Sequence, residues 1–256
     1  MSREGWAEAL DTVSAAHRPL IAMDFDGTLA PFQLDPSLAR IAPAGVTALA
    51  RLIAVPELAL ALITGRSLAD LLTVAEIPVG TRIVGDHGAQ TGYLDDAGPV
   101  VSEVALTPEQ NGLLAELVNE LSPLAQDGAW VEFKTTSVVL HTRPMASRQE
   151  AAALRERARA IGHRLGGIVL DGKELIEFAV IRVTKGEALA RLRVDHRAGI
   201  VLFAGDDQTD ETAMARLTRD DIGIRVGGGP TAATLRMADP AEFTEFLALL
   251  ADRLAP

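Results

Sequence analysis

Residues 20–28 have the sequence Leu-Ile-Ala-Met-Asp-Phe-Asp-Gly-Thr, and the fold prediction depends on this stretch. Its apolar half predicts a buried parallel strand, which ends in two carboxylates one residue apart. Strand alternation sends Asp24 and Asp26 to the same side of the chain. Because open α/β sheets bind ligands at the carboxyl ends of their strands, this position favours a magnesium site. A simple turn is the alternative, since Asp and Gly are also ordinary turn residues.

The composition is that of an ordinary globular protein, with 48% hydrophobic and 23% charged residues among 256. This length allows one large domain or two small ones. The absence of cysteine excludes disulfides and thiolate metal sites and fits a reducing, cytoplasmic location. The net charge of −11 argues against a surface for nucleic acids or anionic membranes. The densest apolar run, residues 58–63, is too short to span a bilayer, so we expect no membrane partner.

Polar residues follow two further apolar runs. Residues 58–63 lead into Thr64-Gly65-Arg66, and residues 200–204 lead into a second acidic group that contains Asp206, Asp207 and Asp210. Segments with helical periodicity lie between these runs. Alternating strands and helices predict a parallel sheet that is covered on both faces and gathers its strand ends at one edge.

The pattern changes after about residue 103. The strands predicted at 130–134 and 137–143 are too close in sequence for a helical crossover, so they must be antiparallel. Capped helices and a third strand pair complete an α+β insertion. We therefore expect a core formed by residues 1–103 and 181–256, with an inserted domain at 104–180.

Alternation gives the inserted sheet two faces. One face would direct apolar side chains toward the helices: Val131, Phe133, Val138 and Leu140. The other would carry mostly polar and charged side chains: Trp130, Glu132, Lys134, His141, Arg143, Lys173 and Glu177. Such a face is often only a solvated surface. The alternative is a face that binds sugar hydroxyls, where charged groups would supply specificity.

The second acidic group favours a bound cation, because several converging carboxylates without a countercharge would repel one another. Oxygen ligands on rigid strand ends suit Mg²⁺ rather than zinc. Lys185 falls in the first turn of a helix capped by Thr184 and Glu187, where the helix dipole disfavours a cation unless an anion lies nearby. A solvated acidic loop and a solvated lysine are the alternatives.

These residues together resemble the four signature motifs of the haloacid dehalogenase superfamily of phosphatases: residues 24–28, Thr64, Lys185 and Gly205-Asp206-Asp207. More narrowly, the chain resembles the trehalose-6-phosphate phosphatases. The narrower resemblance rests on residues 62–66, His87-Gly88, Glu132-Phe133-Lys134, His141-Thr142-Arg143, Gly172-Lys173 with Glu177, Lys185-Gly186 and residues 205–211. It implies an α/β fold: a Rossmann-like parallel-sheet core with an inserted α+β cap domain of the C2 type.

The resemblance also implies roles. Asp24 would be the nucleophile, Asp26 the general acid and base, Thr64 and the amides after it the phosphate-binding groups, and Lys185 a source of positive charge. Mg²⁺ would be held by Asp24, the main-chain carbonyl of Asp26 and Asp206, with Asp207 and Asp210 acting through waters or by orienting Lys185. Substrate contacts would come from Gly65, Arg66, His87, Glu132, Lys134, Arg143, Lys173 and Glu177. His87 can also simply support its loop, and His141 and Arg143 can brace the sheet.

We therefore expect a magnesium-dependent phosphatase that hydrolyses trehalose 6-phosphate through an aspartyl-phosphate. Two alternatives stay open: a related phosphatase for another sugar phosphate, such as sucrose phosphate or a glucosyl phosphate, and a non-catalytic sugar-phosphate-binding module of a synthase complex. The expected partner is a small-molecule sugar phosphate. We expect a monomer, and the resemblance also suggests association with a trehalose-phosphate synthase.

Overall fold

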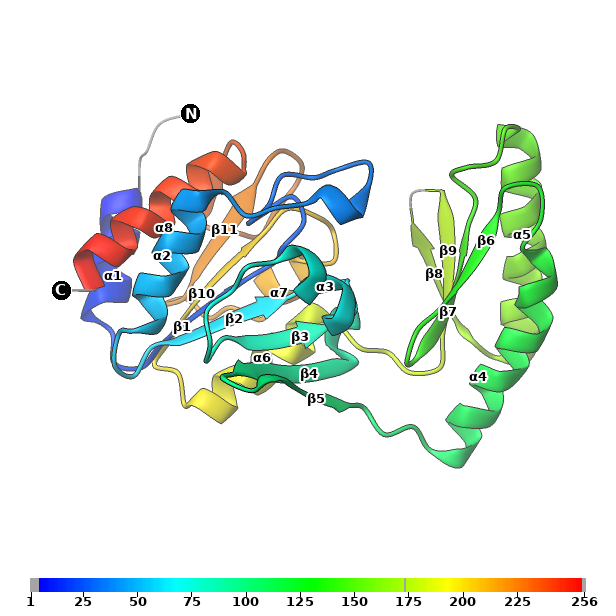
Figure 1. The fold of residues 1–256 in the computed structure, drawn as a ribbon, viewed down its shortest axis with the longest axis horizontal. Coiled ribbons are helices and arrows are strands. Elements are labelled where there is room, and N and C mark those ends of the chain that lie inside the picture. Colours follow the sequence, from blue (N-terminus) through cyan, green and yellow to red (C-terminus); the bar gives the residue numbers. More distant parts are fainter. Residues whose placement is uncertain (1–4, 173, 255–256) are drawn as a thin grey trace. The chain divides into compact units, whose positions relative to one another are not determined.

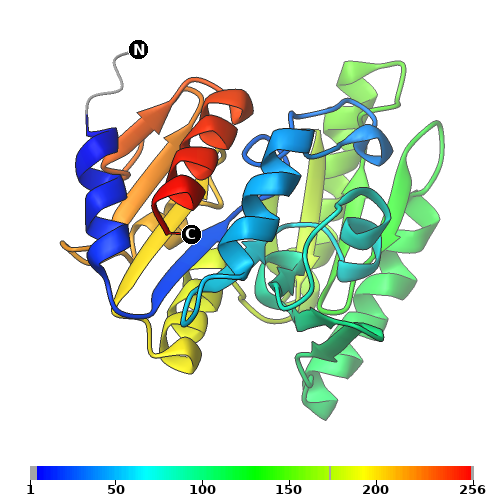
Figure 2. The ribbon, with the colours of Figure 1, turned by 60° about the vertical axis from the view of Figure 1, so that its left-hand side comes forward.

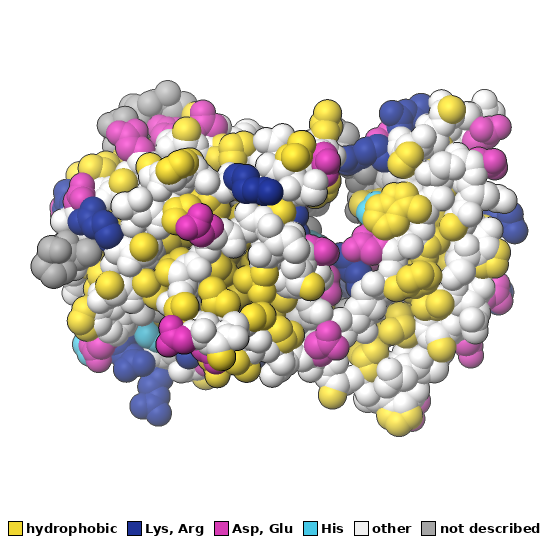
Figure 3. Space-filling model, viewed as in Figure 1, with side chains coloured by type: hydrophobic (Ala, Val, Ile, Leu, Met, Phe, Trp, Pro, Cys, Tyr) yellow, Lys and Arg dark blue, Asp and Glu magenta, His cyan; other side chains and the backbone are white. Residues whose placement is uncertain are grey.

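In this computed structural model, which describes residues 5–172 and 174–254, the chain forms two compact units. The first consists of Met1–Ser102 and Val183–Pro256, and the second of Glu103–Arg182. The second unit is thus inserted into the first, at bounds close to the expected 104–180. Acidic and basic side chains lie interspersed over the face of the molecule shown in Figure 3.

An eight-stranded sheet in the order β12-β11-β10-β1-β2-β3-β4-β5 forms the centre of the first unit (Figure 1). Six neighbouring strands are parallel: β12 (Leu235–Met237), β11 (Ile222–Val226), β10 (Ile200–Gly205), β1 (Pro19–Met23), β2 (Ala59–Ile63) and β3 (Arg82–Gly85). The hairpin of β4 (Gln90–Asp95) and β5 (Gly98–Glu103) extends one edge, with β4 antiparallel to β3. The predicted parallel α/β sheet is confirmed.

Helices cover both faces of this sheet (Figures 1 and 2). One face carries α1 (Trp6–Ala15), α2 (Pro43–Ile53), α3 (Leu68–Val74) and α8 (Pro240–Leu254). The other carries α6 (Lys185–His196) and the short α7 (Glu211–Met214). Short 3₁₀ turns follow β1 and β3, at η1 (Pro36–Leu38) and η2 (Asp86–Gly88).

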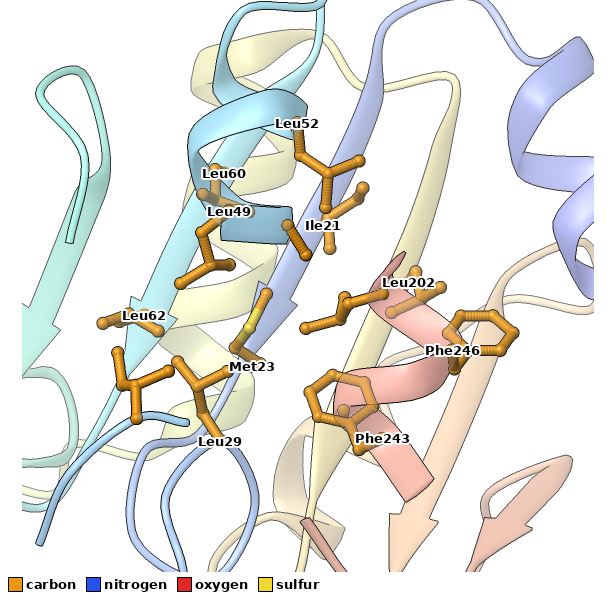
Figure 4. Packing of buried hydrophobic residues seen from close by; sticks show 14 of the residues in the cluster. Ile21, Met23, Leu29, Leu49, Leu52, Leu60, Leu62, Leu202, Phe243 and Phe246 are labelled. Carbon is orange, nitrogen blue, oxygen red and sulfur yellow. The ribbon is translucent and has the colours of Figure 1, made fainter. Parts of the chain in front are cut away.

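Alternation along β1 explains why both faces are apolar. Ile21 and Met23 belong to the cluster formed with Leu49 and Leu52 of α2 and the phenylalanines of α8 (Figure 4). Leu20 and Ala22 belong to the opposite cluster, with α6 and α7. All four side chains are fully buried, as a central parallel strand requires.

The register of β1 with its two neighbours positions the site. Met23 pairs with Ala204 of β10 and with Leu62 of β2, so the loops that follow these strands begin at nearly the same level. The main-chain N–H of Asp24 donates to the carbonyl of Ala204 across 2.9 Å. β1 lies between strands that come from opposite ends of the sequence, which is where open α/β sheets bind ligands.

The second unit has a four-stranded sheet in the order β6-β7-β9-β8. Its strands are β6 (Trp130–Phe133), β7 (Ser137–His141), β9 (Leu175–Ala179) and β8 (Ile168–Gly172), all antiparallel to their neighbours. The helices α4 (Pro108–Leu121), which is followed by η3 (Ser122–Leu124), and α5 (Arg148–Leu165) pack on one face. α4 begins with a capping box between Thr107 and Gln110.

The predicted division of the inserted sheet holds for most of its strands. Val131, Val138 and Leu140 pack with the helices. Phe133 does not, because it ends β6 and is 59% exposed, so its expected burial against the helices is wrong. The part of the chain that the structure describes contains no helix long and apolar enough to cross a membrane.

Candidate active site

Three carboxylates converge at the carboxyl ends of β1 and β10. Asp24, Asp206 and Asp210 each offer an oxygen, and these oxygens lie within 4.8 Å of one another. We call these residues the acidic cluster. Asp24 and Asp210 are buried, while Asp206 is partly exposed. The convergence predicted for these residues from separate parts of the sequence is therefore present.

Lys185 is the cation of this cluster. Its side chain is 2% exposed, and its Nζ lies 3.0 Å from Asp24 Oδ1 and 2.8 Å from Asp210 Oδ1. Thr184 caps α6 by accepting from the N–H of Glu187, which places Lys185 in the first turn as expected. Burial would lower the pKa of Lys185, but Asp24 and Asp210 outweigh it and raise that pKa. Lys185 therefore stays charged.

One lysine does not neutralise three carboxylates. Burial, opposed by Lys185 and supported by repulsion from Asp206, raises the pKa of Asp24 to about 7. Burial and repulsion from Asp210 raise the pKa of Asp206 to about 6. Burial and repulsion from Asp24 raise the pKa of Asp210 to about 7. Without a further positive charge, the site holds protons that acidic side chains normally lose well below neutral pH.

These properties fit a hard divalent cation. The donors are carboxylate oxygens, which suit Mg²⁺, Mn²⁺ or Ca²⁺ better than zinc. A dication would offset the repulsion that raises these pKa values. Asp24 and Asp206 are the better direct ligands, because both oxygens of Asp210 already have partners: Oδ1 accepts from Lys185, and Oδ2 accepts from the N–H groups of Asp206 and Asp207.

Two glycines allow the close approach of these carboxylates. At Gly27, where φ is +80°, an added Cβ would lie 2.2 Å from Asp206 Oδ2. At Gly205, an added Cβ would lie 2.3 Å from the Cβ of Asp210. Thr28 donates from its hydroxyl to Asp206 Oδ1 across 3.2 Å, which orients that carboxylate. The Gly-Thr pair after the second aspartate therefore shapes the site as well as the turn.

Asp207 lies beside the cluster but serves its own loop. Its Oδ1 accepts from the N–H and hydroxyl of Thr209 and from the N–H of Asp210. Burial would raise the pKa of Asp207, but Lys185 and these hydrogen bonds hold it at about 2. Its placement fits the supporting role expected for it, while the three-carboxylate cluster forms without it.

Asp26 is not part of the acidic cluster and forms an ion pair with Arg66 that the sequence did not predict. Arg66 Nε lies 2.6 Å from Asp26 Oδ2, and its Nη2 lies 2.6 Å from Oδ1, a bidentate geometry. The guanidinium also donates to the carbonyl of Pro36 and lies 5.3 Å above the ring centre of Phe25. Arg66 was expected to contact substrate, whereas here it holds the carboxylate of the expected general acid.

The loop after β2 contains Thr64 and Gly65, and His87 of η2 packs against it. Thr64 is buried, and its Oγ1 accepts from the N–H of Arg66 across 3.2 Å. The imidazole of His87 packs directly on Gly65, where an added Cβ would lie 2.6 Å from the ring. His87 has φ of +56°, and its N–H donates to the Thr64 carbonyl. This geometry fits a loop-supporting role for His87.

In the second unit, the face opposite the helices carries the expected polar residues. Glu132, Glu177 and His141 lie on the same side of the sheet. Glu132 and Glu177 both pair with Val139 of β7, and His141 lies two residues after Val139 on that strand. Glu132 Oε2 lies 2.8 Å from His141 Nε2, and Ser137 donates to Glu177 Oε1 across 2.6 Å. Both carboxylates are thus oriented by neighbours on the same face.

Two further expected sugar contacts follow the ends of strands. The hydrogen bond with His141 contributes most to lowering the pKa of Glu132, and Lys134, which follows β6, lowers it further. Arg143 follows β7, and its Nε lies 3.6 Å from Glu174 Oε2, as a sheet brace would. Lys173 lies outside the described residues.

Comparison with known proteins identifies the family. The family model described as trehalose-phosphatase matches residues 22–236. A trehalose-phosphate phosphatase of Mycobacterium marinum is 32% identical over an alignment that covers 93% of this chain and 63% of the relative. A bifunctional trehalose-6-phosphate synthase/phosphatase of Thermoproteus tenax is 30% identical, over 88% of this chain and 30% of the relative. The chain thus spans less than two thirds of either curated relative.

Solved structures agree with this result. The crystal structure of a trehalose-6-phosphate phosphatase related protein is similar with a TM-score of 0.71 and 25% identity, over 91% of this chain and 97% of the other. The matched residues 22–236 contain the acidic cluster, Lys185 and the whole inserted unit. On this evidence, the chain belongs to the trehalose-phosphatase family.

Proposed function

We propose that the protein is a Mg²⁺-dependent phosphatase that hydrolyses trehalose 6-phosphate to trehalose and phosphate through an aspartyl-phosphate. The observation that supports this most is the position of Asp24, a buried carboxylate 3.0 Å from a charged lysine and within the acidic cluster. A site that only bound the sugar phosphate would gain little from concentrating three carboxylates where an anionic phosphate must lie.

Asp24 is the nucleophile in this proposal. One of its carboxylate oxygens attacks phosphorus in line, the P–O bond to the sugar breaks, and an acyl-phosphate forms. Lys185 faces Asp24 Oδ1 and offsets negative charge as the two anions approach. Because Asp210 holds Lys185 from the other side, the ammonium keeps its position while Asp24 reacts.

Asp26 is the general acid and then the general base in this proposal. It protonates the leaving sugar oxygen and then takes a proton from the water that hydrolyses the acyl-phosphate. Both oxygens of Asp26 accept from Arg66, and a guanidinium cannot deliver that proton. Asp26 therefore has to exchange its contact with Arg66 for a contact with the substrate before the first step. Thr64 and the amides that follow it bind the phosphoryl oxygens.

The family implies a divalent metal, and the oxygen donors make Mg²⁺ our choice. Asp24, the main-chain carbonyl of Asp26 and Asp206 would hold it, with Asp207 and Asp210 in support. When bound, the ion supplies charge neutralisation between the nucleophile and the phosphate.

The sugar would be recognised on the second unit's sheet. Glu132 and Glu177 are oriented by His141 and Ser137, so each is positioned to accept hydroxyl hydrogen bonds. Lys134, Lys173 and Arg143 would complete the polar contacts. An analogue that lacks a hydroxyl would leave one of these groups unpaired, which gives selectivity among sugar phosphates.

We further propose a monomeric, cytoplasmic protein. The bifunctional Thermoproteus tenax relative combines a synthase and a phosphatase in its name, which supports a functional link to a trehalose-phosphate synthase.

A panel of phosphorylated sugars with phosphate-release detection tests the function. We expect the highest kcat/KM for trehalose 6-phosphate, dependence on Mg²⁺, and no turnover by D24N with a melting temperature near that of the wild type. Preference for sucrose phosphate or a monosaccharide phosphate would replace the substrate assignment. Absence of hydrolysis with sugar-phosphate binding intact would support a non-catalytic binding module.

A further inference from the structure

Trp130 has an unusual position for a tryptophan. It begins β6 on the polar face of the second unit's sheet, and its side chain is 46% exposed. The other tryptophan of the chain, Trp6, is 4% exposed and packs edge-on against Phe246 in the core of the first unit. An exposed indole on a face of charged side chains contributes little to folding, because much of its apolar surface stays in water.

The indole is fixed by its cross-strand neighbour. Trp130 pairs with His141 in register, and their rings are stacked with centroids 3.9 Å apart and an interplanar angle of 3°. A ring stacked in this way has two faces, of which His141 covers one. The exposed fraction of Trp130 therefore includes the opposite face, held in a defined orientation.

The same histidine connects the indole to a carboxylate. His141 Nε2 lies 2.8 Å from Glu132 Oε2, and Glu132 is two residues from Trp130 on the same face of β6. A flat apolar ring beside an oriented carboxylate matches a pyranose, which has an apolar C–H surface bordered by hydroxyl donors.

We propose that the exposed face of Trp130 is a stacking platform for a pyranose ring of the sugar phosphate, and that Trp130 therefore determines specificity for a disaccharide over smaller phosphate esters. This inference rests on the proposed function, since it adds a residue to the sugar-binding face. His141 acts as a positioning residue that holds both the platform and Glu132.

Intrinsic fluorescence tests binding directly, because the chain has only two tryptophans. In W6F, the emission reports on Trp130 alone. Titration of W6F with trehalose should give a saturable change in that emission, and titration of W130F, which retains Trp6, should give none. Sucrose and glucose are titrated in the same way. If none of these three sugars changes the Trp130 emission in folded W6F, the stacking platform is refuted.

Kinetics provide the second test. W130A should raise KM for trehalose 6-phosphate several-fold, up to about tenfold, with kcat changed much less. Its kcat/KM ratio for trehalose 6-phosphate over p-nitrophenyl phosphate should fall by a similar factor. F133A is the matched control, because Phe133 is also an exposed aromatic of β6 but lies on the other side of the strand; its KM should stay near that of the wild type.

The two proposals fail in different ways. If the wild type hydrolyses trehalose 6-phosphate and W130A has an unchanged KM and substrate ratio, the platform is wrong and the function stands. If the wild type does not hydrolyse it, the function is wrong, and the W6F titration still decides whether Trp130 binds a pyranose. H141F keeps an aromatic ring but loses the bond to Glu132, so it should retain part of the fluorescence response. Complete loss of the response would contradict stacking on Trp130 as the source of the emission change.

Discussion

Replacement of Asp210 by asparagine tests whether the buried ion pair holds the site together. Asp210 is 0% exposed, and its carboxylate has three partners: Lys185 Nζ at 2.8 Å and the N–H groups of Asp206 and Asp207 at 3.0 Å each. Asparagine has nearly the same shape but no charge. Its NH₂ group also has to face either Lys185 Nζ or the N–H groups of Asp206 and Asp207.

The expected loss follows from these contacts. Removing one partner of a buried ion pair costs about 3–5 kcal/mol. Here Lys185 keeps Asp24 at 3.0 Å, and the raised pKa of Asp210 means that its charge does not by itself stabilise the metal-free fold. The loss therefore comes mainly from the buried donor that the NH₂ group leaves unpaired, which costs about 2 kcal/mol. For a chain of this size, about 2 kcal/mol lowers the melting temperature by about 4–8 °C.

Thermal melts followed by circular dichroism, in buffer with a chelator, measure this change. D195N is the matched control, because Asp195 is exposed on the same helix as Lys185 and an exposed substitution alters stability by about 0.5 kcal/mol or less. If D210N melts as the wild type does, Lys185 is not held by this pair, and the positioning role assigned to Asp210 is wrong.

Three further predictions concern the metal and the sugar. Because the folded pKa values of the acidic cluster are raised from 3.8 to about 6–7, deprotonation destabilises the metal-free protein as pH rises from about 4 to about 7; its melting temperature should fall over this range, less so in D206N, and Mg²⁺ should oppose the fall. G27A, whose Cβ would meet Asp206, should weaken Mg²⁺ binding by about 10–100-fold in calorimetry; unchanged affinity would remove Asp206 from the site. S137A, which frees Glu177, should raise KM for the sugar phosphate with little change in kcat; an unchanged KM would exclude Glu177 as a contact.

Much of the first unit could be predicted because its signals are local. Apolar runs such as residues 20–23 and 200–204 form central strands, since burial on both faces leaves few alternatives. Parallel strands place their carboxyl ends at one edge, so Asp24 and Asp206 were expected to meet. Lys185 was expected near an anion because the first turn of a helix disfavours a lone cation.

Other features depend on side-chain choices that periodicity does not encode. Arg66 can reach a substrate or a neighbouring carboxylate, and only the fold shows that it pairs with Asp26. Phe133 has the alternation of a core residue, but β6 ends there and leaves it exposed. β12 is only three residues long, too short for a period to be detected. The stacking of Trp130 on His141 depends on strand register, although alternation already placed both on one face.

Detection of the phosphorylated enzyme tests the central claim most directly. In the proposed mechanism, Asp24, gathered with Asp206 and Lys185 at the strand ends, takes the phosphoryl group. Acid-quenched protein mixed with trehalose 6-phosphate and Mg²⁺ should carry one phosphoryl group on the peptide that contains Asp24, sensitive to hydroxylamine as an acyl-phosphate is, and absent from D24N. Turnover by the wild type with no such adduct in rapid-quench samples, or an adduct that persists in D24N, would contradict the account.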